Sequence, residues 1–366
     1  MRHDYEVGGA AHTLGFTPDL SAPVDGMMAH APDELAGQTG PLEPEFEVAL
    51  HPDGAGAYAE VAGAETALGW APDTELIARR GTWSEVWVRF RKDKFALFGV
   101  VIIVILVLVA ILAPWIAPHD PTKQYTDIGL TAQGMPVGPS SHFWLGTDTL
   151  GRDMASRLMY GARVSLIIGI LANGFALLLG VIFGITAGYF RGGTETFIMR
   201  ATDVMMAFPI FLFAIALSTA INKPGIWVLV LVIGIVYWTP MTRVIHGEVL
   251  SIREKEFVDA ARLTGCSTVR ILYRHVLPHL VAPIIVYTSL GIATTVLFEA
   301  SLSFIGLGVQ PPTPSWGQMI SDAQNYYLIA PWLMIFPGLC IMLTVLAFNL
   351  VGDGLRDAFD PQQRRR

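Results

Sequence analysis

Residues 254–278 read EKEFVDAARLTGCSTVRILYRHVLP, and no other stretch in the second half of the chain is so polar. Hydrophobic segments flank it on both sides. The pattern predicts a helix from Glu254 to Leu263, a break at Gly265, a second helix over 269–276 and a stop at Pro278, which cannot continue a helix interior. Each piece carries apolar residues on one side, namely Val258, Ala261 and Leu263, then Ile271, Leu272 and Val276. We therefore predict a helix–break–helix element outside the lipid that docks on another surface.

The composition around this stretch is that of a membrane protein. Of 366 residues, 52% are hydrophobic and only 15% are charged, which is typical of a polytopic membrane protein. Residues 1–80 hold fourteen acidic and three basic residues, so they carry a net charge of −11, and the remainder carries +4 of the total of −7. Cys266 and Cys340 fall in the polar stretch and in a hydrophobic span, which predicts two reduced, structural thiols.

The N-terminal residues 1–81 are rich in alanine, glycine, proline and acids, and they show no sustained helical or strand period. We interpret them as a disordered acidic tail. A docking or regulatory arm remains a second interpretation. The tail lacks the basic start and the short apolar core of a signal peptide, so we expect it to stay in the cytoplasm.

The character of the chain changes after the tail. Thr82 and Glu85 have the spacing of a capping box, and Trp83, Trp87 and Phe90 follow with helical spacing on one face. Basic residues crowd the end of this segment. Residues 82–94 are therefore predicted to form a short interfacial helix on the inner leaflet.

Runs of about 20 apolar residues, the length that crosses a hydrocarbon core of roughly 30 Å, occur six times. The predicted spans are Phe95–Ala117, Val164–Phe190, Val204–Ile221, Gly225–Thr242, Leu280–Phe298 and Leu328–Gly352. The predicted fold is an all-α, polytopic membrane protein with six transmembrane helices. Its expected parts are the first span 95–117, an extracytoplasmic segment 118–160, a five-helix core 161–353 with the loop 248–279, and a cytoplasmic C-terminal tail 354–366.

Basic residues beside the spans indicate the orientation. They gather before the first span, between the second and third (Arg191, Arg200), in the stretch 254–278, and after the last span (Arg356, Arg364, Arg365, Arg366). All four places lie on one side if both termini are cytoplasmic. Arg152, Arg157 and Arg163 disagree, because they lie on the outer side, and we expect Asp148 and Asp153 to pair with some of them.

Small residues in the second span indicate helix packing. Gly180, Gly184 and Gly188 recur every four residues on one face. A face without side chains lets another helix backbone approach closely. We interpret these glycines as packing residues and not as contacts for a substrate.

Two acidic residues lie within or at the edge of apolar spans. Glu299 is costly in lipid and must face protein or water, so it makes a structural polar bond or lies on a conduction path together with Ser301 and Ser303. The two interpretations stand equal. Asp203 is expected to pair with Arg200, three residues before it on the same helix.

Several kinds of chemistry have no motif in the sequence. It contains no GxxxxGK[ST] phosphate loop, no HExxH, no GxSxG and no cluster with metal-ligand spacing. His275 and His279 flank Pro278, which disfavours a two-ligand site. Carriers coupled to an ion gradient place several carboxylates or histidines in their spans, and this chain places almost none. We predict no enzyme, no cofactor and no metal, and an energy source that acts through residues 254–278.

These residues match a family pattern. The stretch resembles the E-A-A-x3-G-x9-I-x-L-P loop of permeases in bacterial ATP-binding-cassette importers, with Asp259, Ala260, Ala261, Gly265, Leu277 and Pro278 at the matching positions. From Trp144 to Pro361 the chain resembles the C-type permease of dipeptide, oligopeptide and nickel importers. The matching segments are LGTDTLGRD (145–153), YGARVSLIIG (160–169), AGYFRGG (187–193), IMRATDVMMAFP (198–209), EASLSFIGLGVQPPTPSWG (299–317) and LTVLAFNLVGDGLRDAFDP (343–361).

The resemblance implies a type I importer permease fold in which the loop is a coupling helix that sits in a groove of an ATPase subunit. Closure of the ATPase dimer would then tilt the spans from inward-open to outward-open. The implied coupling residues are Glu256, Asp259, Ala260, Ala261, Gly265, Leu277 and Pro278. Two positions depart from the pattern, since Asp259 replaces a glutamate and His275 replaces an isoleucine. Asp259 keeps the charge, and we expect docking to survive.

The resemblance also implies partners in a bacterial cytoplasmic membrane: a related second permease, two ATPase subunits that bind ATP and Mg, and an extracytoplasmic solute-binding protein. We expect the binding protein to dock on residues 145–153 and 306–318, through Asp148, Arg152, Asp153 and Trp316. Nucleic acid is not an expected partner. The predicted cargo is short peptides, with nickel chelates or glutathione-like peptides left open, and an ion-driven secondary transporter is the rival from another class.

Overall fold

The computed structural model describes residues 82–221 and 225–360, and every regular element within these ranges is helical. The elements are α2 (Thr82–Phe90), α3 (Lys94–Ile116), α4 (Thr126–Gly129), α5 (Met154–Phe190), α6 (Gly192–Ala207), α7 (Ile210–Ile221), α8 (Ile226–Arg253), α9 (Glu256–Leu263), α10 (Thr268–Ile271), the π-helical turn η1 (Leu272–Val276), α11 (Leu277–Phe304), α12 (Trp316–Asp322) and α13 (Trp332–Phe359). The predicted tail 1–81, residues 222–224 and the C-terminal Arg364, Arg365 and Arg366 lie outside the described residues.

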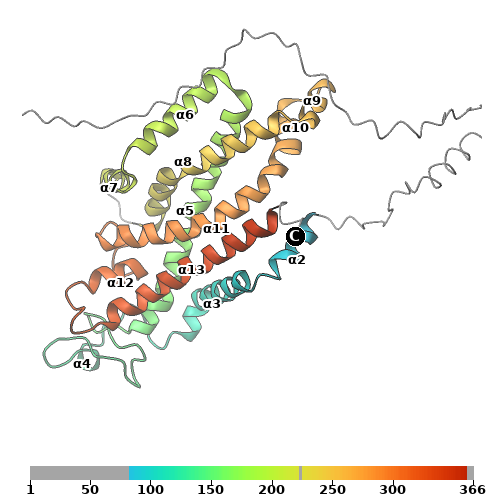
Figure 1. Ribbon diagram of the computed structural model, residues 1–366. Coiled ribbons are helices and arrows are strands. Elements are labelled where there is room, and N and C mark those ends of the chain that lie inside the picture. Colours follow the sequence, from blue (N-terminus) through green and yellow to red (C-terminus); the bar gives the residue numbers. More distant parts are fainter. Residues whose placement is uncertain (1–81, 222–224, 361–366) are drawn as a thin grey trace, which may run out of the picture. The chain divides into compact units, whose positions relative to one another are not determined.

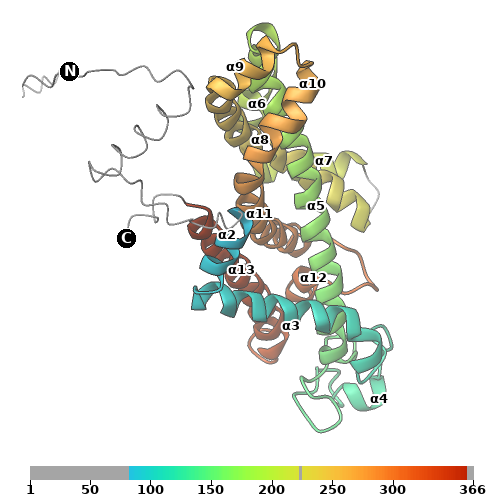
Figure 2. The ribbon, with the colours of Figure 1, turned by 90° about the vertical axis from the view of Figure 1, so that its right-hand side faces the viewer.

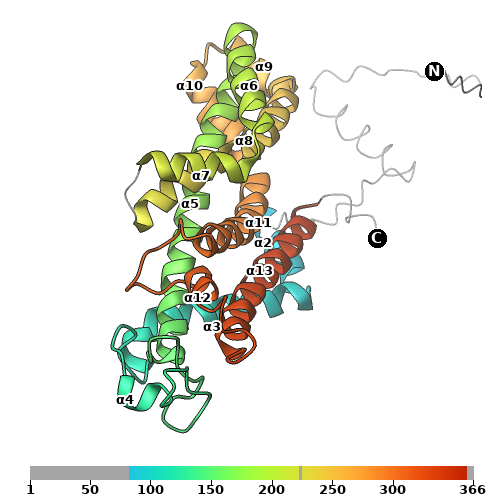
Figure 3. The ribbon, with the colours of Figure 1, turned by 90° about the vertical axis from the view of Figure 1, so that its left-hand side faces the viewer.

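Among the described helices, five are long and apolar enough to cross a bilayer: α3, α5, α8, the continuous helix Thr268–Phe304, and α13. The helices α6 and α7 form a sixth apolar segment that is bent by 93° (Figure 3). The third span is therefore not the single helix Val204–Ile221 that we predicted. Pro209 lacks a backbone N–H and forces Phe208 into an extended conformation, with φ −80° and ψ 139°.

Four of the spans extend well beyond their predicted ends: α5, α8, the helix Thr268–Phe304, and α13, which runs to Phe359 into the predicted tail 354–366. The helix α5 has 37 residues, a length of about 55 Å, which exceeds a hydrocarbon core of roughly 30 Å. It begins at Met154 because the Asp153 side chain accepts the backbone N–H of Ser156. The helix α8 continues past the predicted end at Thr242 to Arg253. Helical structure therefore projects out of the apolar layer at the ends of α5 and α8.

The glycine stripe of α5 packs against α8, which confirms the prediction. A Cβ atom added at Gly184 would lie 2.7 Å from the Cβ of Ile245. Gly180 and Gly188 meet the residues one turn before and after, Met241 and Val249, in the same way. The two backbones approach so closely that no larger residue fits, so α5 and α8 form one rigid pair.

The helix α2 packs against the end of α13 (Figure 2). Val86 and Phe90 are buried there beside Ala358, while Trp83 and Trp87 are exposed. Phe90 has the spacing of the tryptophan face, as predicted, but packing against α13 buries it while the two tryptophans stay exposed. In this single chain only the tryptophan side of α2 is free to lie on a membrane.

The helices α9 and α10 lie at one end of α5, and the segment with α4 lies at the other end (Figure 1). The first end contains the predicted coupling loop. The second end contains the predicted docking residues, and α12 packs nearby against α5, α11 and α13. The two candidate sites are thus separated by the length of α5.

Candidate functional site

The helix α9 ends in a glycine motif. Gly265 has φ +76°, its N–H donates to the carbonyl of Arg262 at 2.9 Å, and the N–H of Cys266 donates to the carbonyl of Ala261 at 3.1 Å. This pair of bonds is the Schellman motif, in which the positive φ favours glycine. The predicted break at Gly265 is therefore confirmed, and its cause is backbone conformation, since a Cβ at Gly265 would meet no atom within 4 Å.

The second half of the loop does not stop at Pro278. The helix continues from Thr268 to Phe304 without a gap, so the predicted stop is wrong. The N–H of Leu277 donates to the carbonyl of Leu272, five residues back, in the π-helical turn η1. Pro278 follows in the first turn of α11. The wider π turn accommodates a residue that would break a regular α-helix.

The buried side of the loop joins three spanning helices. Val258, Ala261, Ile271 and Val276 are buried, as predicted. They belong to one hydrophobic cluster with Tyr189 of α5, Met241, Ile245, Val249 and Ile252 of α8, and Leu280 of α11. The loop is therefore packed rigidly onto the ends of α5, α8 and α11.

The predicted coupling residues lie on different sides of the loop. Glu256, Asp259, Ala260, Gly265 and Pro278 are exposed, Leu277 is half-buried and Ala261 is buried. Consecutive residues of a helix point about 100° apart, so the two alanines of the family pattern, Ala260 and Ala261, do not form one close-fitting face. Ala261 anchors the loop to the core, while Ala260 stays available to a partner.

The loop also exposes an apolar surface that the sequence reasoning missed. Leu263, Val269 and Tyr273 are 88%, 76% and 75% exposed. Leu263 was expected on the buried side, but it lies about 200° around the helix from Ala261. The two-residue spacing of Ala261 and Leu263 in the sequence already indicates that they lie on different sides of the helix. Three large apolar side chains on one protruding loop are typical of a protein–protein contact.

Charged residues frame the same loop. The Asp259 carboxylate accepts a hydrogen bond from Arg262 at 2.8 Å. The guanidinium groups of Arg253 and Arg262 lie over the ring of Tyr189, at 5.7 Å and 5.5 Å from its centroid, and Arg253 donates to the Tyr189 carbonyl at 2.6 Å. The end of α5 is thus held to both α8 and α9.

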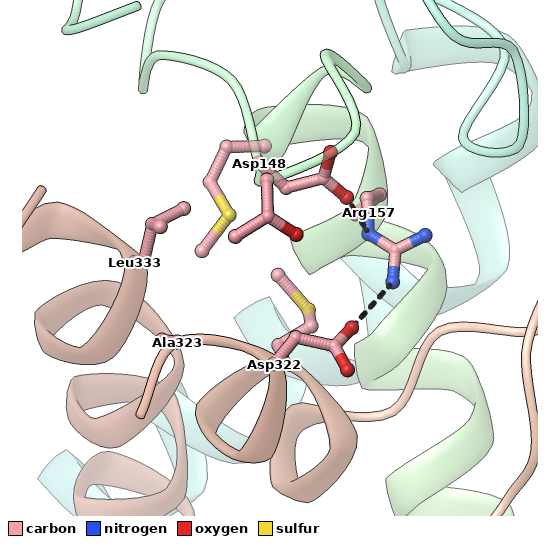
Figure 4. Close-up of a pocket in the computed structure, with 8 residues that line it drawn as sticks. Asp148, Arg157, Asp322, Ala323 and Leu333 are labelled. Carbon is pink, nitrogen blue, oxygen red and sulfur yellow. Dashed lines mark ion pairs between the residues drawn. The ribbon is translucent and has the colours of Figure 1, made fainter. Parts of the chain in front are cut away.

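A buried charge cluster lies at the other end of α5 (Figure 4). Asp148 accepts from Arg152 Nε at 2.6 Å and lies 3.2 Å from Arg157 Nε, which confirms the predicted pairing. Both arginines also lie 3.8 Å from Asp322 of α12. The cluster borders a small cavity of about 10 Å³, the space of one water molecule. Its charges join the 147–153 turn, α5 and α12.

The four predicted docking side chains lie inside the protein. Asp148, Arg152, Asp153 and Trp316 are all buried. Asp153 caps α5, and the Trp316 indole N–H donates to the carbonyl of Leu158 at 3.1 Å. A partner at this end would therefore touch the surface around them, which these four side chains hold in shape. Buried charges are costly without such partners.

Glu299 lies at the junction of α5, α11 and α12. The hydroxyl of Ser165 donates to it at 3.2 Å and the hydroxyl of Ser303 at 2.7 Å, and all three side chains are buried. Within this chain Glu299 makes structural polar bonds. Ser301 is partly exposed and lines an open groove of about 340 Å³ with Phe211 of α7, so the three predicted path residues separate.

The prediction for Asp203 is wrong. Its carboxylate pairs with Arg243 of α8 at 2.6 Å, and not with Arg200 of its own helix. The packing of α6 beside α8 supplies a partner from another helix, which spacing along one helix could not reveal.

Comparison with known proteins identifies relatives over most of the chain. Residues 180–365 match the family model described as binding-protein-dependent transport system inner membrane component. Residues 81–132 match the N-terminal TM domain of oligopeptide transport permease C. Among solved structures, a chain of the MetNI methionine ABC transporter in an inward-facing conformation has a TM-score of 0.48 and 15% identity, over 57% of this chain and 98% of that chain.

Curated relatives match over more of the sequence. The di/tripeptide transport system permease protein DppC of Pseudomonas aeruginosa is 43% identical over 76% of this chain and 91% of its own length. The dipeptide transport system permease protein DppC of Alkalihalophilus pseudofirmus is 42% identical over 77% of this chain and 90% of its own. The glutathione transport system permease protein GsiD of Escherichia coli is 42% identical over 77% of this chain and 91% of its own length. The chain belongs to the family of inner membrane components of binding-protein-dependent transport systems.

Proposed function

We propose that this chain is a permease subunit of an ATP-driven importer of short peptides. The observation that carries the proposal is the loop of α9 and α10, whose buried side is fused to three spanning helices and whose outer side exposes Leu263, Val269 and Tyr273. Such an element receives a partner and passes its movement to the spans. The relatives named for di/tripeptides and dipeptides support the cargo.

The partners in this proposal are a related second permease, two ATPase subunits and an extracytoplasmic binding protein. The ATPase subunits bind ATP and Mg and carry out hydrolysis. Its α9–α10 end and both termini lie in the cytoplasm, and its α4 end lies outside the bacterial inner membrane. The basic residues near α9 support this orientation.

Transmission through the loop follows from its packing. An ATPase groove takes up Leu263 and Tyr273 together with Asp259 and Ala260. Closure of the ATPase dimer displaces α9 as a unit, because the Schellman bonds at Gly265 fix its end. The displacement reaches α5 and α8 through Val258 and the buried cluster around it. It reaches α11 through the π turn.

Docking of the binding protein at the α4 end relies on exposed groups. Trp144 is 60% exposed and Leu150 is 44% exposed, on either side of the buried Asp148. Gln310, Pro311 and Pro312 are exposed in the loop between α11 and α12. These groups form the contact, while the charge cluster beneath them keeps the surface rigid.

Uptake by the reconstituted complex tests the proposal. Proteoliposomes that contain this permease with its own second permease, ATPases and binding protein should accumulate labelled Leu-Leu when they hold ATP, and not when they hold only a proton or sodium gradient. Glutathione and a nickel chelate, added as competitors, test the two alternative cargoes. Accumulation driven by the gradient without ATP would contradict the proposal and favour a secondary transporter.

A further inference from the structure

The break between α6 and α7 is an exposed gap in a spanning segment. The helical hydrogen bonds stop at Ala207, and the next helix starts with a bond from Phe213 N–H to the carbonyl of Pro209, at 3.0 Å. Phe208 and Pro209 are exposed in this chain. Irregular backbone at membrane depth is tolerated only where protein covers it or where it lines a water-filled cavity. The break therefore does not face lipid.

An exposed ion pair lies one turn away. Asp203 of α6 and Arg243 of α8 are 2.6 Å apart, and each side chain is 45% exposed. Charged groups within spanning elements face the bundle interior or an aqueous path. Asp203 and Met206 are three residues apart, so both lie on one side of α6 near its end at the break.

A pocket of about 300 Å³ lies at this place. Its lining consists of Met205, Met206, Phe208, Ile210 and Phe213 from α6 and α7, and Val236, Thr239 and Pro240 from α8. Thr239 lies four residues before Arg243, so Arg243 is one helical turn from the pocket lining on α8. Flexible methionine side chains adapt to apolar groups of different shape.

We propose that this pocket and the Asp203–Arg243 pair form the part of the translocation path in this chain that receives the cargo, a zwitterionic short peptide. The pocket takes an apolar side chain of the peptide. Asp203 binds its ammonium group and Arg243 binds its carboxylate. The pair is half-exposed, and exposed pairs contribute little stability, so a peptide can replace each partner with a charge of equal sign. This inference rests on the proposed function of the chain.

The charge pattern selects this occupant over the other candidates. A lipid tail would leave the ion pair and the broken backbone in hydrocarbon, where both are costly. A segment of the second permease that covered the pocket would shield Met206→Cys from labelling both with and without peptide. A short peptide supplies an apolar group and two opposite charges within one small molecule.

Cysteine labelling tests the pocket. The full complex is placed in nanodiscs without nucleotide, with Cys266 and Cys340 replaced by serine and alanine, and carries Met206→Cys. A membrane-impermeant maleimide should label this cysteine, and saturating Leu-Leu should slow the labelling several-fold. Phe98→Cys on α3, where Phe98 is 55% exposed on an apolar helix, is the matched control and should stay unlabelled. If Met206→Cys is not labelled, or is labelled at the same rate with peptide, the inference is wrong.

Uptake measured in parallel separates the two proposals. If the wild-type complex accumulates no peptide with ATP, the proposed function fails. If it accumulates peptide while Met206→Cys shows no protection, only the pocket assignment fails. The Phe98→Cys control should keep ATP-driven uptake, which would show that the complex with the replaced cysteines assembles.

The ion pair has its own measurement. Asp203→Asn and Arg243→Gln should each lower uptake about tenfold, the effect of one lost charge-assisted hydrogen bond. Glu195→Gln is the matched control, because Glu195 forms another tie from α6 to α8, to His246 at 2.8 Å, away from the pocket. Equal losses in all three variants would mean that the pair only holds the helices together, and the assignment of Asp203 and Arg243 would be overturned.

Discussion

Two ion pairs of almost equal length lie at opposite ends of α5. Arg152 and Asp148 are 2.6 Å apart at the α4 end, with side chains 4% and 7% exposed. Arg262 and Asp259 are 2.8 Å apart in α9, with side chains 36% and 58% exposed. Each pair joins residues less than five positions apart. Their chemistry is nearly the same, but their surroundings are not.

The difference indicates two kinds of surface. A buried charge must keep all its partners, because an unpaired charge inside protein is very costly. The α4 end is therefore rigid, and its outer residues are held in one arrangement. An exposed pair is screened by water and can be exchanged. The loop of α9 and α10 keeps one apolar side buried against the spans, while its charges and a second apolar surface lie outside, so it can bind and release a partner without losing its fold.

Replacing Asp148 should have the largest effect. Asp148→Asn leaves Arg152 and Arg157 without their closest carboxylate, and breaking a buried pair costs about 3–5 kcal/mol. We expect a strongly reduced yield and a lower thermal midpoint of the purified complex. Asp127→Asn in α4, at an exposed position, is the control and should behave as the wild type. An unchanged thermal midpoint for Asp148→Asn would show that the buried ion pair is no more important for stability than the exposed pair in α9.

The glycine at the end of α9 should come next. A valine at Gly265 must adopt a left-handed conformation, at a cost of roughly 1–2 kcal/mol, and the loop would change shape locally. We expect the permease to insert normally while the ATPase no longer co-purifies with it. Gly247→Val on α8, where an added Cβ meets nothing within 4 Å, should keep the ATPase. Retained ATPase in the Gly265 variant would argue against a fixed loop geometry.

Surface substitutions at the two ends should act on different partners. Leu263→Asp should weaken ATPase binding about tenfold, since it places a charge in an apolar contact. Trp144→Ser should weaken docking of the binding protein and leave ATPase binding unchanged. Binding of each partner is titrated separately against both variants. If Leu263→Asp also weakened binding of the binding protein, or Trp144→Ser that of the ATPase, the two ends would not have separate partners.

The exposed pair in the loop should matter least for stability. Asp259→Asn removes a partner of Arg262, yet exposed pairs contribute at most about 1 kcal/mol. The thermal midpoint of the complex should change little, in contrast to Asp148→Asn. A loss as large as that of Asp148→Asn would mean that Asp259 is structurally essential.

Sequence patterns predicted features that depend on near neighbours. The stripe Gly180, Gly184 and Gly188 showed a close helix contact, and the break at Gly265 followed from one residue. Pro209 was also a visible signal for the end of α6, but the apolar run across it favoured a continuous span. The length and hydropathy of a segment do not reflect the one backbone N–H that Pro209 lacks. The bend between α6 and α7 was therefore not predicted.

Features that depend on distant residues could not be predicted in the same way. The partner of Asp203 is Arg243, forty residues later, and the burial of Asp148 requires α12 to bring Asp322 beside two arginines. Helical spacing showed that Ala261 and Leu263 lie on different sides, but only the packing decided which of the two is buried. Each outcome depends on which helices become neighbours.

The sequence by itself determined the number and order of apolar segments, the polar loop between two of them and its family pattern, because hydrophobicity, glycine and proline act over a few residues. The tertiary structure decided which side of each element is buried. It placed the charges of Asp148 and Arg152 inside at one end of α5 and those of Asp259 and Arg262 outside at the other. Burial and partner choice arise from contacts between helices far apart in the chain, and the surrounding solvent or protein then decides the strength of an otherwise similar ion pair.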